Sequence, residues 1–313
     1  MRSVESRSSI GTPSPSKTSN VAASPSKASA AAVPPPPPPL QPGSQQLRPE
    51  FPPPATVPVP IKADQEMPVV ERAADLNERL AFAEARKLLL PYAGSSNAKA
   101  RCALAVSCVH LADGALLAKP PQPAAAKEYA VEALTHATAA TELDGGSFEA
   151  KIWFGQAIQT KAKAIEGGLG QARVCAAMVH AWDEAVELAP EQPLPYHLLG
   201  SFAFHTSALP WVAAQSMRAL SPGLRKFSAD DSMQLLRMSE ERRVQQGQQG
   251  APPKAFAVQN CSMLGRLYLK KGDKPSARTW LDRALELAAN AQIVLDHSAH
   301  EAVADAKKAR AKL

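Results

Sequence analysis

The stretch that decides the fold is CSMLGRLYLKKGDKPSARTWLDRALELA, residues 261–288. Its apolar residues recur at intervals of three and four, the spacing that places side chains on one face of an α-helix. Gly265 and Ala277 are small enough to let two helices approach closely, and Gly272 can take the positive φ that a turn between them requires. The space between the helices would be filled by Leu264, Tyr268 and Leu281. The stretch therefore predicts a helical hairpin.

Similar units occur upstream of this hairpin. In the run Tyr196-x-x-Leu199-Gly200 a Leu-Gly pair follows Tyr196 at the spacing at which Leu264-Gly265 follows Cys261. The pair Phe154-Gly155 lies in the first helix of a further unit. These runs match the tetratricopeptide pattern, in which each helical hairpin buries an apolar face against the next one. The sequence therefore predicts an all-α fold, a tetratricopeptide-like helical-hairpin solenoid. The residues expected to pack the repeats are Phe154, Gly155, Trp182, Ala185, Pro190, Tyr196, Leu199, Gly200, Leu264, Gly265, Tyr268, Ala277, Leu281 and Ala284.

The spacing between units is irregular, because Gly200 and Gly265 stand 65 residues apart, whereas regular repeats of this type recur about every 34 residues. Part of the extra length surrounds Pro210-Trp211, which we interpret as a loop. A tryptophan there either closes the insertion onto the groove of the solenoid as a plug or belongs to a binding surface. We favour the plug.

The amino-terminal stretch has a different composition from the rest of the chain. It contains 17 of the 29 prolines, all before residue 69, and its only aromatic residue is Phe51. A segment so poor in large apolar side chains cannot offset its ordering entropy by burial. We therefore expect two parts, a disordered Ser/Pro-rich arm at 1–68 and a helical domain at 69–313. The six prolines at 34–39 predict a polyproline II run, a stiff spacer or a ligand for aromatic grooves, and we favour the spacer.

Charge follows the same division, since residues 1–63 carry a net charge of +4 and the remainder about +2. A basic arm favours an acidic partner, such as nucleic acid, an anionic membrane or the surface of a microtubule, and a solvated linker is the alternative. Ser14 and Ser24 each stand in a Ser-Pro-Ser-Lys unit, which is typical of a proline-directed phosphorylation site. Phosphate at both would cancel most of the arm's charge, although such dipeptides also arise by chance in this composition.

The four cysteines are scattered without a C-x-x-C pair, which indicates a reducing compartment. No apolar run approaches the ~18 residues that a transmembrane helix needs, and no secretory signal is evident. We expect a cytoplasmic location and regard organelle import as less favoured.

Catalytic and metal-binding patterns are weak. His297 and His300 could hold a metal at their three-residue spacing, but no third ligand is evident. The glycine-rich run 167–170 lacks the Lys-Ser/Thr of a phosphate loop, and no Ser/His/Asp or Cys/His arrangement stands in a supporting motif. We therefore expect no enzyme activity, no catalytic residues, no metal and no cofactor.

Two basic pairs in the second half of the helical domain are candidates for a partner surface, together with Trp211. The pairs are Arg225-Lys226 and Arg242-Arg243. Such pairs usually lie on a solvated face, and the sharper alternative is contact with acidic tubulin tails or phospholipid headgroups.

The order of motifs and insertions over about 75–313 resembles the regulator of microtubule dynamics family, whose members have a degenerate tetratricopeptide domain. The stretches that carry the resemblance are 127–143, 150–154, 181–190, 195–200, 209–212 and 265–274. The resemblance implies a non-catalytic interaction protein that associates with microtubules or the spindle, with tubulin or microtubule-associated proteins as partners and no nucleic acid. Lipid binding or transfer at organelle contacts is the alternative that it implies.

Overall fold

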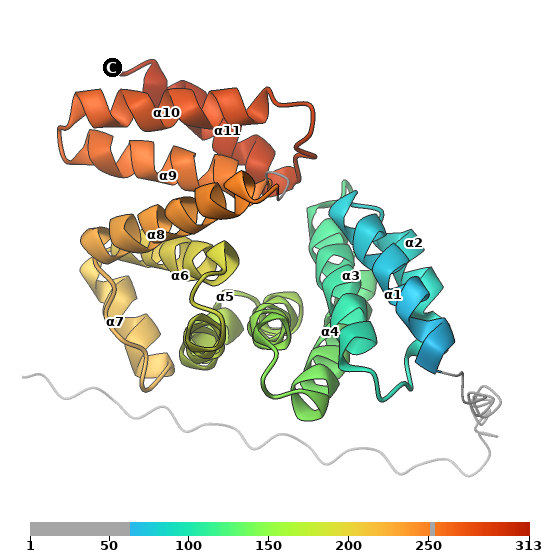
Figure 1. The fold of residues 1–313 in the computed structure, drawn as a ribbon. Coiled ribbons are helices and arrows are strands. Elements are labelled where there is room, and N and C mark those ends of the chain that lie inside the picture. The colour runs from blue at the N-terminus through green and yellow to red at the C-terminus, as the bar shows by residue number, and fades with distance from the viewer. Residues whose placement is uncertain (1–62, 251–253) are drawn as a thin grey trace, which may run out of the picture. The chain divides into compact units, whose positions relative to one another are not determined.

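A computed structural model describes residues 63–250 and 254–313, and all regular structure in these ranges is helical (Figure 1). The helices are α1 (Ala63–Glu78), α2 (Phe82–Leu89), α3 (Ala98–Leu117), α4 (Pro123–Leu143), α5 (Phe148–Leu188), α6 (Pro193–Ser207), α7 (Trp211–Leu220), α8 (Ala229–Gln248), α9 (Phe256–Lys270), α10 (Lys274–Ala288) and α11 (His297–Arg310), with a short 3-10 helix (Leu90–Tyr92) after α2. The predicted all-α class is confirmed. The expected arm lies almost wholly outside the described residues.

Several helices begin where a polar side chain satisfies backbone N–H groups that the helix itself leaves free. Asn97 caps α3, Ser147 caps α5, and Asp273 caps α10. Ser228 and Asp231 form a reciprocal capping box at the start of α8. These short-range hydrogen bonds fix where each helix starts, and thereby how long the turns between hairpins are.

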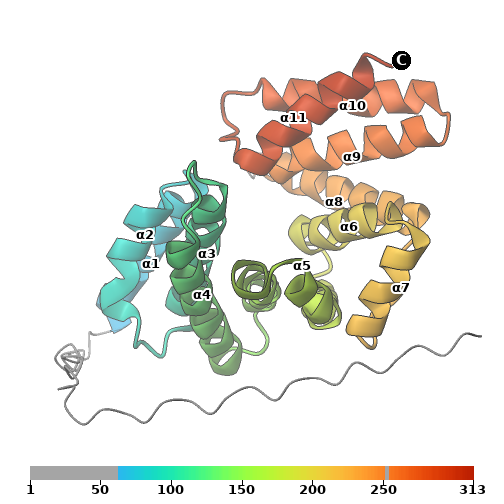
Figure 2. The same cartoon turned by 180° about the vertical axis from the view of Figure 1, so that it is seen from behind.

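The helices pair as antiparallel hairpins along the chain. Figures 1 and 2 show α3 beside α4 and α9 beside α10 from opposite sides, and α6 packs on α8 across the intervening α7. At the amino-terminal end α1 and α2 cover α3, and at the carboxyl-terminal end α11 packs on both α9 and α10. The apolar clusters also join neighbouring pairs, since one of them combines Leu236 of α8 with Leu264 of α9.

The long helix α5 is itself a hairpin. Gly167 has φ +65° and ψ −150°, a conformation that essentially only glycine adopts, and it separates residues 148–166 from 168–188. The indole Nε1 of Trp182 in the second half donates to the carbonyl of Ile152 in the first, at 3.4 Å. The glycine-rich run is thus a joint between two packed helices.

A repeated glycine contact holds three of these hairpins closed. A Cβ added to Gly155 would lie 2.6 Å from Nε1 of Trp182, one at Gly200 would lie 2.9 Å from Leu236, and one at Gly265 would lie 2.5 Å from Leu281. A side chain larger than hydrogen would collide at each place. The Leu-Gly runs of the sequence therefore mark close approaches between paired helices.

Most of the repeat-packing residues named from the sequence lie in these interfaces. Tyr196, Leu199, Leu264, Ala277, Leu281 and Ala284 are buried, as are Trp182, Ala185 and the three glycines. Phe154 and Tyr268 are partly buried at cluster edges. Pro190 is exposed in the turn after α5, where its carbonyl accepts a hydrogen bond from the Tyr196 hydroxyl at 3.0 Å.

Two parts of the fold differ from the sequence expectation. The spacing of Leu76, Leu80, Ala83 and Leu88 predicts one first helix, but Leu80 has φ +62° and separates α1 from α2. The stretch from Trp211 was expected to be a loop and is the helix α7. At both places the apolar residues have helical spacing. This spacing does not show where the chain turns from one helix into the next.

Among the described helices, α3 alone is long and apolar enough to cross a membrane by length and composition. It packs against α2, α4 and α5, and its alanines 100, 103, 105, 112 and 115 are buried there. These contacts account for its apolar composition as that of a core helix.

Candidate binding groove

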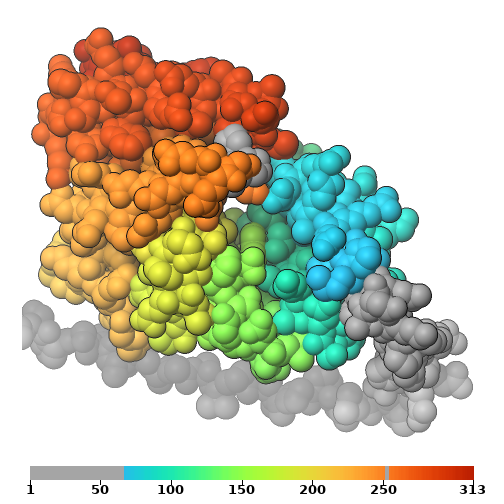
Figure 3. All heavy atoms as spheres, viewed as in Figure 1, coloured from blue at the N-terminus to red at the C-terminus, as the bar shows by residue number. Residues whose placement is uncertain are grey.

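A groove of about 1260 Å³ runs between the two ends of the helical body. One wall comes from α3 and α5, and the other from α6, the start of α9 and the residues around the start of α11. Figure 3 shows the surface hollowed between the cyan part and the yellow and orange parts. Aromatic and imidazole rings line much of it, among them His110, Trp153, Trp182, His197, Phe202 and Phe256.

On the first wall His110 is held between two rings. Its imidazole stacks on Phe82 with centroids 4.2 Å apart, and Trp153 meets it edge-on at 5.6 Å. Burial lowers the pKa of His110, so the ring is neutral at pH 7. Around His110 this wall therefore offers uncharged ring surface, and the ion pair of Lys163 with Asp113 lies on the same wall.

On the second wall His197 is fixed by a chain of hydrogen bonds. Its Nδ1 lies 2.8 Å from Oδ1 of Asn260, whose Nδ2 donates to the Ser239 hydroxyl at 2.9 Å, and that hydroxyl donates to the carbonyl of Pro193 at 2.8 Å. Because Oδ1 can only accept, Nδ1 is the protonated nitrogen and Nε2 keeps its lone pair.

The environment of His197 keeps it uncharged. Its side chain is only 5% exposed and stacks on Phe256, with centroids 5.2 Å apart. Burial lowers its pKa. Within the described residues Nε2 has no hydrogen-bond partner, and His197 borders the groove. The groove thus combines apolar surface with one oriented hydrogen-bond acceptor, the composition typical of a ligand-binding pocket.

The expectation that Trp211 plugs the groove is wrong. Trp211 begins α7, its side chain is 73% exposed, and it is not among the residues that line the groove. The neighbouring Val212 is 66% exposed. Pro210 ends the preceding turn and directs the chain into a helix that buries none of its residues, which leaves the indole on the surface.

The two basic pairs have different surroundings. Arg225 binds Asp183 at 2.8 Å and lies over the ring of Phe227 at 4.8 Å, while Lys226 is exposed. Arg242 is partly exposed and contacts Gln245, which lies three residues on along α8.

Arg243 is not on the surface, so its place in the expected partner surface is wrong. It is 9% exposed and forms a bidentate ion pair with Glu240, one turn earlier on α8. A buried guanidinium needs such a carboxylate partner to offset its desolvation. The pattern of two adjacent arginines could not reveal which of them faces inward.

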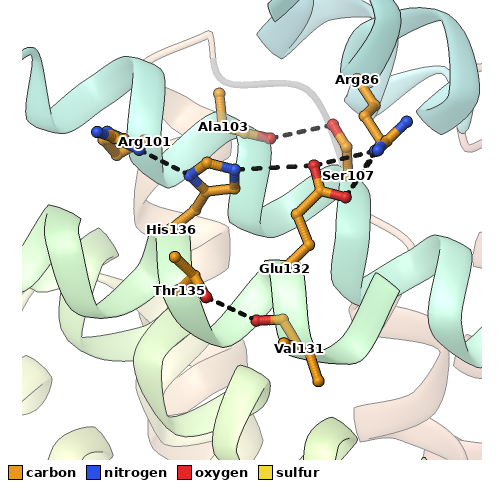
Figure 4. A network of polar contacts seen from close by, with 8 residues as sticks. All are labelled: Arg86, Arg101, Ala103, Ser107, Val131, Glu132, Thr135 and His136. Carbon is orange, nitrogen blue, oxygen red and sulfur yellow. Dashed lines mark hydrogen bonds and ion pairs between the residues drawn. The ribbon is translucent and has the colours of Figure 1, made fainter. Parts of the chain in front are cut away.

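A polar network that the sequence did not suggest joins α2, α3 and α4 (Figure 4). Arg86 donates to both carboxylate oxygens of Glu132, with the shortest contact at 2.7 Å, and Arg101 donates to Nδ1 of His136 at 3.1 Å. Burial opposes ionisation of Glu132, but hydrogen bonds from His136 and Arg86 outweigh it and lower its pKa to about 2. The network links α4 to both α2 and α3, and α3 forms part of the first wall of the groove.

The cysteines and the remaining histidines form no recognisable reactive centre. Burial raises the pKa of Cys102 and Cys108 to about 12, which keeps both as thiols. His297 lies 3.3 Å from Glu301. Within residues 63–250 and 254–313 no three metal-ligating side chains come together. Ser14 and Ser24 lie outside the described residues.

The chain is similar in sequence to known proteins. A family model described as "Regulator of microtubule dynamics protein 1-3" matches residues 69–311. Regulator of microtubule dynamics protein 1 of Rattus norvegicus is 25% identical over 163 residues, which are 51% of this chain and 48% of the relative.

Two further relatives carry related names. Regulator of microtubule dynamics protein 3 of Rattus norvegicus is 27% identical over 167 residues, 51% of this chain and 32% of the relative. The protein of the same name from Bos taurus is 30% identical over 110 residues, 34% of this chain and 20% of the relative. The matched stretches thus span about half or less of each relative's length. Because the family model covers most of the helical domain, the chain belongs to the regulator of microtubule dynamics family.

Proposed function

We propose that this chain is a non-catalytic interaction protein that associates with microtubules and acts in the cytoplasm at the cytoskeleton or spindle. The observation that carries the proposal is the groove, whose rings and oriented acceptor form a preshaped surface for a segment of a protein partner. The names of the relatives, regulators of microtubule dynamics, supply the choice of microtubules. Tubulin or a microtubule-associated protein is the proposed partner.

The division of labour within the chain is part of this proposal. The helical domain at 69–313 would provide the specific contact, and the basic arm at 1–68 would add electrostatic attraction that phosphorylation of Ser14 and Ser24 reduces. Charge attraction of this kind weakens as salt screens it, whereas shape-specific contacts in the groove respond much less.

Co-sedimentation with microtubules across a salt series tests the proposal. We expect the full chain to sediment at low salt, and we expect deletion of residues 1–62 to reduce both affinity and salt sensitivity. Ser201→Trp, which places bulk at a partly exposed position in the groove wall, should weaken the salt-resistant component. Absence of sedimentation of the full chain at low salt would reject direct association.

A second function, lipid binding, is favoured by the same groove for a different reason. The groove is open rather than plugged by Trp211, and aromatic and aliphatic side chains dominate its lining. Native mass spectrometry of the full chain after incubation with mixed phospholipid vesicles should then show a bound lipid, and Ser201→Trp should lose it. A spectrum of protein alone in both cases would contradict this function.

A further inference from the structure

Charge within the helical body is unevenly distributed. Residues 254–313 contain eleven cationic and six anionic side chains, a net charge of +5, whereas residues 64–250 carry a net charge of −3. The segment with the positive excess is the unit formed by α9, α10 and α11. An acidic partner would therefore be attracted to this end of the body and repelled by the rest of it.

The cations gather in a cleft of about 400 Å³ between α9 and α11. These two helices run parallel, since Ser262 bonds to the carbonyl of Ala302 and Arg266 bonds to Asp305, so their carboxyl-terminal ends lie together. The cleft is lined by Arg266, Lys270, Lys308 and Lys312, with the apolar Leu269 and Ala309 and the single acid Asp305.

Arg266 and the lysines differ in what they already bind. Arg266 is fixed by Asp305 at 2.5 Å and by the ring of Phe204, 4.8 Å from its guanidinium carbon. Lys270, Lys308 and Lys312 are exposed, and none of them takes part in an ion pair within the described residues. The one acid is thus already neutralised, and three positive charges remain for a ligand.

The spacing of the cations indicates the kind of ligand. On α9 the two cations, Arg266 and Lys270, are four residues apart, which corresponds to about 6 Å along the axis, and Lys312 follows Lys308 at the same sequence spacing just past the end of α11. Side chains on one face of an extended peptide recur every second residue, at about 6.6 Å. The three unpaired lysines, one on α9 and two on the opposite side of the cleft, therefore suit the successive carboxylates of an extended acidic chain.

We propose that the cleft between α9 and α11 binds an extended acidic peptide rich in glutamate or aspartate. A concave site suits a single chain better than the flat face of a membrane, and lysines without fixed orientation suit carboxylates at variable positions. The proposal deepens the microtubule association proposed above, on which it rests for the natural source of the peptide, the acidic tails of tubulin.

The experiment is fluorescence anisotropy of a labelled octaglutamate peptide with the full chain at low and high salt. Lys270→Glu with Lys308→Glu should weaken binding about tenfold at low salt, because both sides of the cleft lose a positive charge and gain a negative one. The matched control is Lys99→Glu with Lys127→Glu, which makes the same change in net charge at exposed lysines of α3 and α4. This control should stay within about twofold of the unchanged protein, since those sites are remote from the cleft.

Lys270 and Lys308 also lie in the last turns of their helices, where cations stabilise the helix dipole. Thermal unfolding of each variant therefore accompanies the binding assay, and Lys270→Gln with Lys308→Gln provides a milder pair that should still weaken binding. Equal losses in the cleft and control pairs would overturn the proposal, as would binding to phosphatidylserine vesicles without binding to the peptide. If the peptide result holds and no microtubules sediment, the cleft stands and the microtubule association falls.

Discussion

At the scale of single residues, the close approach of paired helices depends on glycines that face a large side chain. Gly265 lies against Leu281, and an added methyl group there would meet a side chain and a backbone nitrogen that are both fixed in the core. Gly114 on α3 has nothing within 4 Å of the same position. The two glycines therefore separate the effect of crowding from the effect of helix propensity.

We predict that Gly265→Ala lowers the free energy of unfolding by about 2 kcal/mol, because the hairpin of α9 and α10 must open to admit the methyl group. Gly114→Ala should instead raise it by about 0.5–1 kcal/mol, since alanine is the better helix former. Urea denaturation of both variants measures the difference. Similar effects in the two would contradict the role assigned to the glycine contact.

The two tryptophans Trp182 and Trp211 provide a second contrast. Trp182 is 2% exposed and closes the hairpin of α5, so Trp182→Ala should cost about 3–5 kcal/mol. Trp211→Ala should change stability by less than about 0.5 kcal/mol, because its ring is mostly in water. Thermal unfolding distinguishes them, and a large loss at Trp211 would restore the rejected plug.

What the sequence could predict at this scale follows from physical range. Glycines and their apolar neighbours indicate a close helix contact through spacing alone, because the contact repeats in three hairpins. The burial of Arg243 depends on which face of α8 packs against the neighbouring helices. Two adjacent arginines in the sequence do not show which face that is. The network joins Arg86 of α2 to Glu132, 46 residues away on α4, and Arg101 of α3 to His136, 35 residues away. Periodicity within a single helix does not reveal such contacts.

At the scale of elements, the joint within α5 determines how the middle hairpin closes. The glycine-rich run at 167–170 lacks the pattern of a phosphate loop, and the structure shows that a single residue of this run makes the turn between two helices. The identity of that residue was not predictable, because glycines 167, 168 and 170 are chemically equivalent. In the structure Gly167 alone of the three has a positive φ.

We predict that Gly167→Ala lowers the free energy of unfolding by about 1–3 kcal/mol, since alanine is strained at φ +65° and ψ −150°. Gly168→Ala is the matched control. Gly168 is exposed, has no positive φ, and has open space around an added Cβ, so this change should be neutral or stabilise by up to about 1 kcal/mol. Circular dichroism during thermal unfolding compares the two, and equal stability would show that the joint tolerates a side chain.

At the scale of the whole molecule, the groove walls make stability depend on pH. Burial lowers the pKa of both His110 and His197 below the ordinary value of 6.5. As pH falls through 6.5 these two imidazoles therefore bind protons in the unfolded chain but not yet in the folded chain. The free energy of unfolding decreases as a result. Glu132 acts in a lower window, because its pKa of about 2 gives a contribution that is present above 4.5 and lost as pH falls towards 2.

We predict that the melting temperature falls between pH 7 and pH 5 and that His197→Gln, which keeps a donor for Asn260, reduces this fall. The exposed His300 supplies the control, and His300→Gln should leave the pH dependence unchanged. Differential scanning calorimetry across the pH range measures it. A melting temperature that stays constant from pH 7 to pH 5 would show that the buried imidazoles do not govern acid stability.

The glycine contacts also set an order for the chain as it leaves the ribosome. Each glycine meets its partner within the same hairpin, so that 148–188 can close before 193–248 has emerged, and 256–288 closes last. The groove is completed later than the hairpins, since its lining residues extend from Leu80 to Ser298. A nascent chain would thus acquire its folded hairpins one by one and gain a complete binding surface only after Ser298 has emerged.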